Sequence, residues 1–276
     1  MPGQDPIARQ LRRFLPEPLA LRLSRWKNIA FMMCVYQLAK RRPEFVKKGL
    51  LGKVRAELGP DCDIATDYTP KYNPWEQRVC LVPDSDLFRA IKERRASVVT
   101  GEIEMFTERG IRLKSGRELE ADIIVTATGL VLQMLGGAEI VIDGSRVDPG
   151  ATLAYKGVMI SGVPNMASVF GYINASWTLK ADLICGYVCR LLNHMDRKGA
   201  SQVTPRAREE GVAPFVEGFS PGYIQRALTA WPKQGAAAPW RVNQNYIRDL
   251  ISLKWSRIDD PALEFSIAPR SSLNDR

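Results

Sequence analysis

The stretch "ELEADIIVTATGL", residues 118–130, decides the fold, because its apolar run ends in three small residues, Ala127, Thr128 and Gly129. A strand buried only for packing would continue with bulky side chains. In open α/β sheets, ligands bind beyond the carboxyl ends of the strands, where small residues let a ligand approach the backbone. Close packing of a helix explains the same residues, so the stretch alone leaves both interpretations open.

Three alternating segments surround this point of the chain. They cover residues 98–106, 111–113 and 119 onward, with turns at 108–110 and 115–116. The alternation then gives way to the continuous apolar run "IIVTA", which is typical of a sheet covered on both faces. We therefore predict an α/β protein in which a β-meander leads into a buried sheet.

Helices are predicted on both sides of these strands. Residues 5–58 are predicted to form three helices, the first with Asp5 as its N-cap and Pro6 at its first position. Further elements are predicted, in chain order, as an ordered loop at 60–78, a strand at 79–83, a helix at 86–94 capped by Asp84 or Ser85, a strand at 158–163, a helix at about 177–198, and helices around 221–228 and 243–255.

Composition limits the classes of protein that the chain can belong to. With 276 residues, 45% of them hydrophobic, the chain can bury a sizeable core in one or two domains. The net charge of +9 is compatible with nucleic acid, an anionic membrane surface or a phosphate-bearing cofactor. No recognition motif accompanies the charge, so nucleic acid is not expected as a partner. The basic residues are densest in residues 9–55, where a basic helix with Trp26 could lie on a membrane or pack on the protein.

The cysteines indicate a reducing compartment and no metal site. Five cysteines, an odd number without a signal peptide, argue against a disulfide framework and favour the cytoplasm. Cys185, Cys189 and His194 cannot converge from one helix, because His194 lies about 140–180° around the helix from the two cysteines. The cysteines are instead expected to be small buried residues. The apolar run at 29–36 has 8 residues, whereas a membrane span needs about 20.

A second candidate for ligand binding is "GYINASWTLKADL", residues 171–183. Gly171, Asn174 and Ser176 precede the longest predicted helix of the C-terminal half of the chain. A helix N-terminus offers free N–H groups and a partial positive charge, which suit a phosphate or an electron-rich carbonyl of a flavin ring. Ordinary helix capping explains the same residues.

Taken together, several runs resemble the class B flavoprotein monooxygenases, which use FAD and NADPH. Among these, the chain is most similar to the mycobacterial Baeyer–Villiger monooxygenases that activate thioamide prodrugs such as ethionamide. The resemblance covers residues 4 to about 268 and is carried by "YNPWEQRVCLVPDSDLFRAI", "GIRLKSGRELEADIIVTATGL", "LAYKGVMISGVPNMASVFGYINASWTLKADL" and "PWRVNQNYIRDL".

The resemblance implies roles for particular residues. Arg78 matches the active-site arginine of the family, which is thought to stabilise the flavin peroxide anion and to contact the nicotinamide. Residues Ala127, Thr128 and Gly129 match the conserved strand end between the two dinucleotide domains. Residues Asn174, Ala175 and Ser176 would start the helix near the flavin. Guanidinium chemistry suits the role of Arg78, because the group stays charged and donates in a fixed fork.

One departure from the family changes the expectation for this chain. The family carries two G-x-G-x-x-G fingerprints, for FAD and for NADPH, whereas here no two of the 21 glycines are two positions apart. The chain therefore resembles the C-terminal half of such an enzyme, with a partial Rossmann-like sheet. Expected domains are the remainder of the NADPH-binding or insert domain at 1–78, part of the FAD domain at 79–198 and an extension packing on it at 199–276.

The resemblance also implies a reaction for the intact protein. It would reduce FAD with NADPH, form a C4a-peroxyflavin with oxygen, and oxygenate a small ketone or a soft sulfur. The chain alone is expected to bind FAD poorly and to be inactive, since the phosphate-binding turns are absent. Two alternatives stay open: a non-catalytic interaction or membrane-surface module in the cytoplasm, and a partner polypeptide that supplies the missing N-terminal half.

Overall fold

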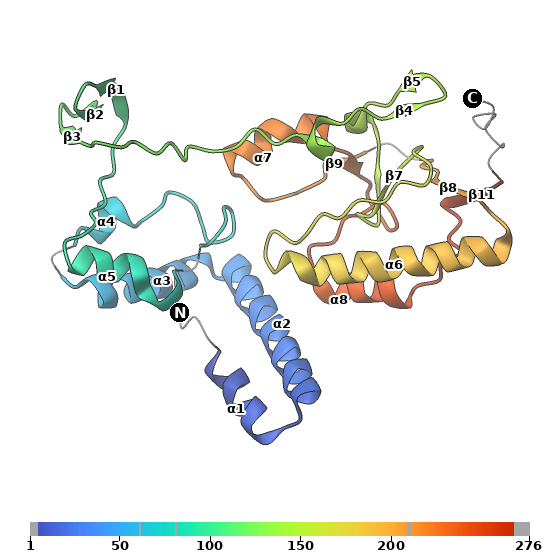
Figure 1. Cartoon of the computed structure of the whole chain (residues 1–276), viewed down its shortest axis with the longest axis horizontal. Coiled ribbons are helices and arrows are strands. Elements are labelled where there is room, and N and C mark those ends of the chain that lie inside the picture. The colour runs from blue at the N-terminus through green and yellow to red at the C-terminus, as the bar shows by residue number, and fades with distance from the viewer. Residues whose placement is uncertain (1–4, 61, 81, 209–210, 268–276) are drawn as a thin grey trace. The chain divides into compact units, whose positions relative to one another are not determined.

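Helices dominate the first part of the chain in the computed structural model, which describes residues 5–60, 62–80, 82–208 and 211–267 (Figure 1). Its helices are α1 (Pro6–Phe14), α2 (Glu17–Arg41), α3 (Pro43–Leu58), the short α4 (Ile64–Asp67) and, after the 3-10 turn η1 (Pro83–Ser85), α5 (Asp86–Lys92). The three helices predicted over residues 5–58 are confirmed. Asp5 caps α1 as expected, since its Oδ1 accepts hydrogen bonds from the N–H groups of Ile7 and Ala8 at 3.0 and 3.2 Å.

The chain divides into two units, and each is described here by itself. The first contains Met1–Asn28 and Cys34–Leu130, and the second contains Ile29–Met33 and Val131–Arg276. Of the helices within the described residues, none has both the length and the hydropathy that crossing a bilayer requires.

The predicted β-meander is present in the first unit. Strands β1 (Ile103–Thr107), β2 (Gly110–Leu113) and β3 (Glu118–Glu120) form an antiparallel sheet in that order. Gly110 is required at the first turn, because its φ is +155° and an added Cβ would lie 2.0 Å from the carbonyl oxygen of Leu119. The turn residues therefore predicted this part of the fold correctly.

Two local predictions in the first unit are wrong. The described residues between 79 and 83 are not in a strand, and Leu81 lies outside the described residues. Ser85 precedes α5 but its side chain does not cap the helix; its hydroxyl donates to Glu57 at 3.0 Å instead. A cap prediction from sequence cannot anticipate a competing carboxylate 28 residues away.

The buried strand predicted after the meander is also not formed. Residues 121–130 are extended and exposed throughout, with Ile123 at 82% and Val125 at 83% exposure. An apolar segment becomes a buried strand only when neighbouring strands pair with it and other elements cover its faces. Among the described residues, only the N–H of Ala121 is seen to continue the meander, donating to the carbonyl oxygen of Arg109 at 3.0 Å, and residues 122–129 are in no strand. The prediction of a covered sheet is therefore corrected.

The second unit is built around α6 (Trp177–Lys198), whose bounds match the predicted helix. Its other helical elements are η2 (Met134–Gly137), η3 (Pro149–Ala151), α7 (Gly222–Ala227), η4 (Leu228–Ala230), α8 (Tyr246–Asp249) and the π-helix η5 (Leu250–Trp255). Its strands form four antiparallel pairs: β4 (Val141–Ile142) with β5 (Ser145–Arg146), β6 (Ala154–Tyr155) with β7 (Met159–Ile160), β9 (Ala213–Pro214) with β10 (Lys233–Gln234), and β8 (Gln202–Pro205) with β11 (Leu263–Ser266). The strand predicted at 158–163 is thus present as the short β7.

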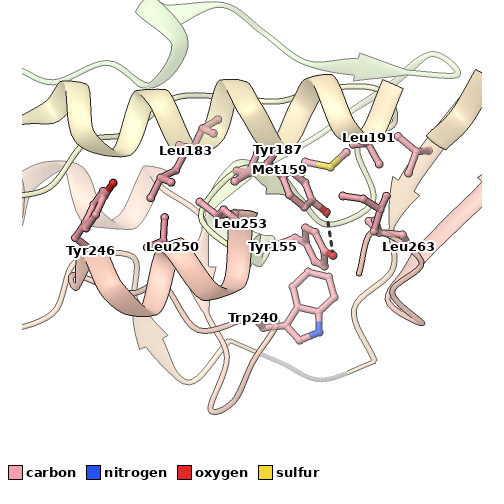
Figure 2. Close-up of a cluster of buried hydrophobic side chains, with 14 of the residues drawn as sticks. Tyr155, Met159, Leu183, Tyr187, Leu191, Trp240, Tyr246, Leu250, Leu253 and Leu263 are labelled. Carbon is pink, nitrogen blue, oxygen red and sulfur yellow. Dashed lines mark hydrogen bonds between the residues drawn. The ribbon is translucent and has the colours of Figure 1, made fainter. Parts of the chain in front are cut away.

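One face of α6 forms the core of this unit. Its buried apolar side chains recur every three or four residues and are Leu183, Ile184, Tyr187, Leu191 and Met195. They pack with Leu250 and Leu253 of η5 in one cluster of buried side chains. Figure 2 shows Leu183, Leu250 and Leu253 between the two helices. Each fully buried side chain of this size contributes about 1.5–3 kcal/mol of transfer free energy.

The opposite face of α6 is exposed to solvent. Cys185 and Cys189 lie on it, so the expectation that they are buried is wrong, and all five cysteines are free thiols. Within the described residues, no group of three potential metal ligands gathers. The chain as a whole has mixed helices and strands, in agreement with an α/β protein at that level, and its sheets have two or three strands each.

Candidate cofactor-binding site

The N-terminus of α6 begins without a side-chain cap from its N-cap residue. Ser176 has an extended backbone, and its hydroxyl lies 2.8 Å from Oγ1 of Thr178 and caps no N–H of the helix. Capping by Ser176 was the alternative to ligand binding, and this geometry excludes it. The N–H of Leu179 donates to the carbonyl oxygen of Ser176 at 3.2 Å, and the first turn carries the positive end of the dipole of this 22-residue helix.

Asn174 is fixed just before the helix by a distant segment of the chain. Its side-chain amide donates to the carbonyl oxygen of Gln244 at 2.9 Å, and the N–H of Ile173 donates to Gln244 Oε1 at 3.1 Å. The amide nitrogen of Gln244 is buried and has no hydrogen-bond partner among the described residues. An unsatisfied buried donor costs about 1–3 kcal/mol.

A buried ion pair between α6 and α8 lies next to this turn. Lys180 Nζ is 3.0 Å from Asp249 Oδ2, and both side chains are 1% exposed. The hydroxyl of Tyr172 donates to the same carboxylate oxygen at 2.7 Å. Burial raises the pKa of the Tyr172 hydroxyl, with the Asp249 charge adding to the shift, whereas burial lowers the pKa of Lys180.

Aromatic side chains pack beside the same turn. The ring of Phe170 contacts those of Trp177, Phe215 and Trp231, with centroids 5.0–5.3 Å apart. Gly171 lies so close to Trp177 that an added Cβ would sit 2.2 Å from its Cγ. Close approach of the chain to the first residue of α6 therefore requires glycine at position 171.

The second predicted region, Ala127 to Gly129, lies in the exposed extended segment of the first unit. Gly129 has φ +130°, which side-chain-bearing residues rarely adopt. All three residues are exposed, so the alternative in which a helix packs closely on them is not seen among the described residues. Their backbone is open to another molecule.

Arg78 lies in an exposed loop of the first unit, just after the short bridge between Pro74 and Gln77. No hydrogen bond or ion pair within the described part of the chain links it to residues 127–129. Residues Asn174, Ala175 and Ser176 belong to the second unit, where Gln244 holds the first of them. The structure thus places residues 174–176 together at the start of α6, and the assignment of these residues, of Arg78 and of residues 127–129 to one site stays a prediction.

Sequence reasoning missed Lys180, Gln244 and Asp249. A signal for Lys180 was available, since a lysine occupies a position on the apolar stripe that continues through Leu183 and Tyr187. The run "NQNY" at 243–246 is polar within an apolar stretch, which is a weaker indication of buried hydrogen bonds.

Comparison with known proteins gives the family context for this geometry. No protein-family model matches the chain. The chain is 50% identical over 270 residues to the FAD-containing monooxygenase EthA of Mycobacterium tuberculosis, covering 97% of this chain and 55% of that protein. It is 47% identical over 267 residues to the probable FAD-binding monooxygenase AlmA of Acinetobacter baylyi, covering 96% of this chain and 53% of that protein.

A solved structure supports the fold alone. The crystal structure of OTEMO with FAD bound has a TM-score of 0.53 at 16% identity, and the match covers 87% of this chain and 51% of that one. The chain spans about half the length of the curated relatives it matches. Along almost its whole length, the chain is thus similar to about half of each of these proteins, which are named as FAD-containing or probable FAD-binding monooxygenases.

Proposed function

We propose that the chain is the C-terminal part of an FAD- and NADPH-dependent monooxygenase that oxygenates a small ketone or a sulfur-containing molecule. The relatives are named FAD-containing monooxygenases, and OTEMO has been crystallised with FAD and NADP. The observation that carries the proposal is the uncovered apolar segment 121–130, which continues from β3 and ends in Ala127, Thr128 and Gly129. Paired with strands of a second polypeptide part, it would complete a Rossmann-like sheet.

The residues present fit one part of FAD. The start of α6, which Ser176 does not cap with its side chain, offers backbone hydrogen-bond donors to the electron-rich carbonyls of the flavin ring. The sequence contains no G-x-G-x-x-G turn for the pyrophosphate, so we assign those contacts to the remaining half. When bound, FAD supplies the redox chemistry between NADPH and molecular oxygen.

Arg78 is the residue that we assign to the reaction itself. It is exposed in its loop, so its guanidinium is accessible to a cofactor or substrate. A guanidinium stays protonated at any working pH and stabilises negative charge that develops on an oxygen. Residues 1–78 would then belong to the NADPH-binding or insert domain, 79–198 to the FAD domain and 199–276 to an extension packing on it.

The test compares the chain alone with a reconstituted pair. We expect the purified chain alone to carry little FAD and to show no NADPH oxidation. Co-expression with the segment of M. tuberculosis EthA that this chain does not cover is expected to give a complex with stoichiometric FAD and NADPH-dependent oxygen uptake. A stoichiometric yellow complex of the chain alone would contradict the proposal. A stable pair without flavin would contradict it as well.

A second candidate function, an interaction or membrane-surface module in the cytoplasm, is favoured by exposed aromatic side chains in the basic helices. Phe14, Trp26 and Phe45 are exposed in α1, α2 and α3. Sedimentation with vesicles containing anionic lipid, compared with neutral vesicles, separates the two candidates. Binding that persists when the complementary segment of EthA is present would favour the membrane module.

A further inference from the structure

Two clusters of the same composition hold α6 in the second unit. One consists of Tyr172, Lys180 and Asp249, and the other of Tyr155, Lys156 and Asp260. In each, a tyrosine hydroxyl donates to an aspartate oxygen, at 2.7 and 2.9 Å, and a lysine lies beside that oxygen, at 3.0 and 3.3 Å. In each, the lysine also lies over the tyrosine ring, 5.1 and 5.3 Å from its centre.

The cluster at Lys180 is the more deeply buried of the two. Lys180 and Asp249 are each 1% exposed, whereas the side chains of Lys156 and Asp260 are 8% and 17% exposed. Lys180 Nζ also donates to the carbonyl oxygen of Asn243 at 3.0 Å, so its charge is well satisfied. Buried ion pairs are often no more stabilising than apolar side chains of the same size, so this pair is weak evidence of stability. Its bonds do fix the positions of Tyr172, Lys180 and Asp249 relative to one another.

The geometry that this cluster fixes is the turn before α6. Tyr172 precedes Ile173 and Asn174, both of which bond to Gln244. Lys180 is the fourth residue of α6, and Asp249 is the last residue of α8. The cluster therefore ties the turn, the helix that follows it and the segment at 243–249 to a single carboxylate.

We propose that Tyr172, Lys180 and Asp249 are positioning residues that hold residues 173–176 in the geometry in which they contact the flavin ring. The inference rests on the proposed function, because the flavin contact does. It assigns no chemistry to the three residues themselves. The cluster at Tyr155 contacts Tyr187 of α6, through the Tyr155 hydroxyl at 3.3 Å and through Lys156 over the Tyr187 ring, and it stabilises the fold without holding that turn.

The first arm of the test measures the turn in the full chain without any ligand. Tyr172→Phe removes the hydroxyl that reaches Asp249, and Tyr155→Phe is the matched control in the other cluster. Amide hydrogen exchange at Ile173, corrected for global stability, is expected to be about tenfold faster in Tyr172→Phe. The same exchange is expected to be unchanged in Tyr155→Phe. Equal exchange in the two variants would overturn the proposal.

The second arm measures flavin affinity in the complex with the complementary segment of EthA. Tyr172→Phe and Lys180→Met are expected to weaken FAD binding about tenfold, whereas Tyr155→Phe leaves it unchanged at a comparable melting temperature. Equal FAD affinity in all three variants would overturn the proposal. A complex of the unaltered chain that binds no FAD would contradict the proposed function, and the exchange result would then show separately whether the cluster holds the turn.

Discussion

At the scale of single residues, Gly171 and Gly186 allow a sharp test of how tightly the turn before α6 is packed. A Cβ at position 171 would lie 2.2–2.7 Å from the ring and Cβ of Trp177, whereas a Cβ at position 186 would meet nothing within 4 Å. Gly171→Ala should therefore lower the free energy of unfolding by about 1–3 kcal/mol through overpacking. Urea unfolding followed by tryptophan fluorescence measures the effect.

The control substitution should act in the opposite direction. Gly186 lies inside α6, where alanine is favoured over glycine by about 0.5–1 kcal/mol. We expect Gly186→Ala to be more stable than the unaltered chain. If Gly171→Ala were as stable as Gly186→Ala, the close contact between position 171 and Trp177 would not exist in solution.

At the scale of elements, the exposed segment 121–130 is predicted to be an interface strand. Val125→Lys places a charge on a side chain that is 83% exposed, so the stability of the chain alone should change by no more than about 0.5 kcal/mol. Aggregation of the chain alone should decrease, because charges protect unpaired strand edges. Assembly with the complementary segment of EthA should be lost, since the charge would become buried.

A matched substitution distinguishes this loss from a general effect of added charge. Val212 is also exposed, at 66%, and lies before β9 in the second unit. We expect Val212→Lys to assemble as well as the unaltered chain in size-exclusion chromatography. If Val125→Lys assembled normally, the prediction that segment 121–130 is an interface strand would be wrong.

Elements that depend on a short-range sequence pattern could be predicted from the sequence. α6 has a periodic apolar stripe and ends at Gly199 with φ +64°, and the meander depends on Gly110. The segment at 121–130 carries the same kind of signal, but its burial depends on partners that the described residues do not contain. Asn174 and Ser176 could be placed for the same reason, because they precede a recognisable helix. The hydrogen-bond partner of Asn174, Gln244, lies 70 residues further along the chain.

At the scale of the whole molecule, the buried tyrosines predict a loss of stability in alkali. Burial raises the pKa of Tyr187 to about 12, and it raises the pKa values of Tyr155 and Tyr172 further in the same direction. In the unfolded chain these hydroxyls lose their protons near the ordinary value of 10.0. Above that pH the unfolded state binds fewer protons than the folded state, so the free energy of unfolding falls as pH rises.

The two buried lysines act in the opposite direction at lower pH. Burial lowers the pKa values of Lys156 and Lys180 below the ordinary 10.5, so the folded state binds fewer protons there than the unfolded state. Their contribution to stability therefore increases as pH rises towards 10.5. The sum of the two effects is a maximum of the free energy of unfolding near pH 10, followed by a decline.

Urea unfolding between pH 8 and pH 11.5 tests this shape, since each buried tyrosine contributes a slope of about −1.4 kcal/mol per pH unit once its unfolded form ionises. Tyr187→Phe removes one of the three groups and should make the decline shallower by up to that amount. Absorbance at 295 nm should show tyrosines that ionise only on unfolding. A free energy of unfolding that stays constant above pH 10, or a decline unaltered in Tyr187→Phe, would mean that these hydroxyls are open to solvent and that the core around α6 is packed differently.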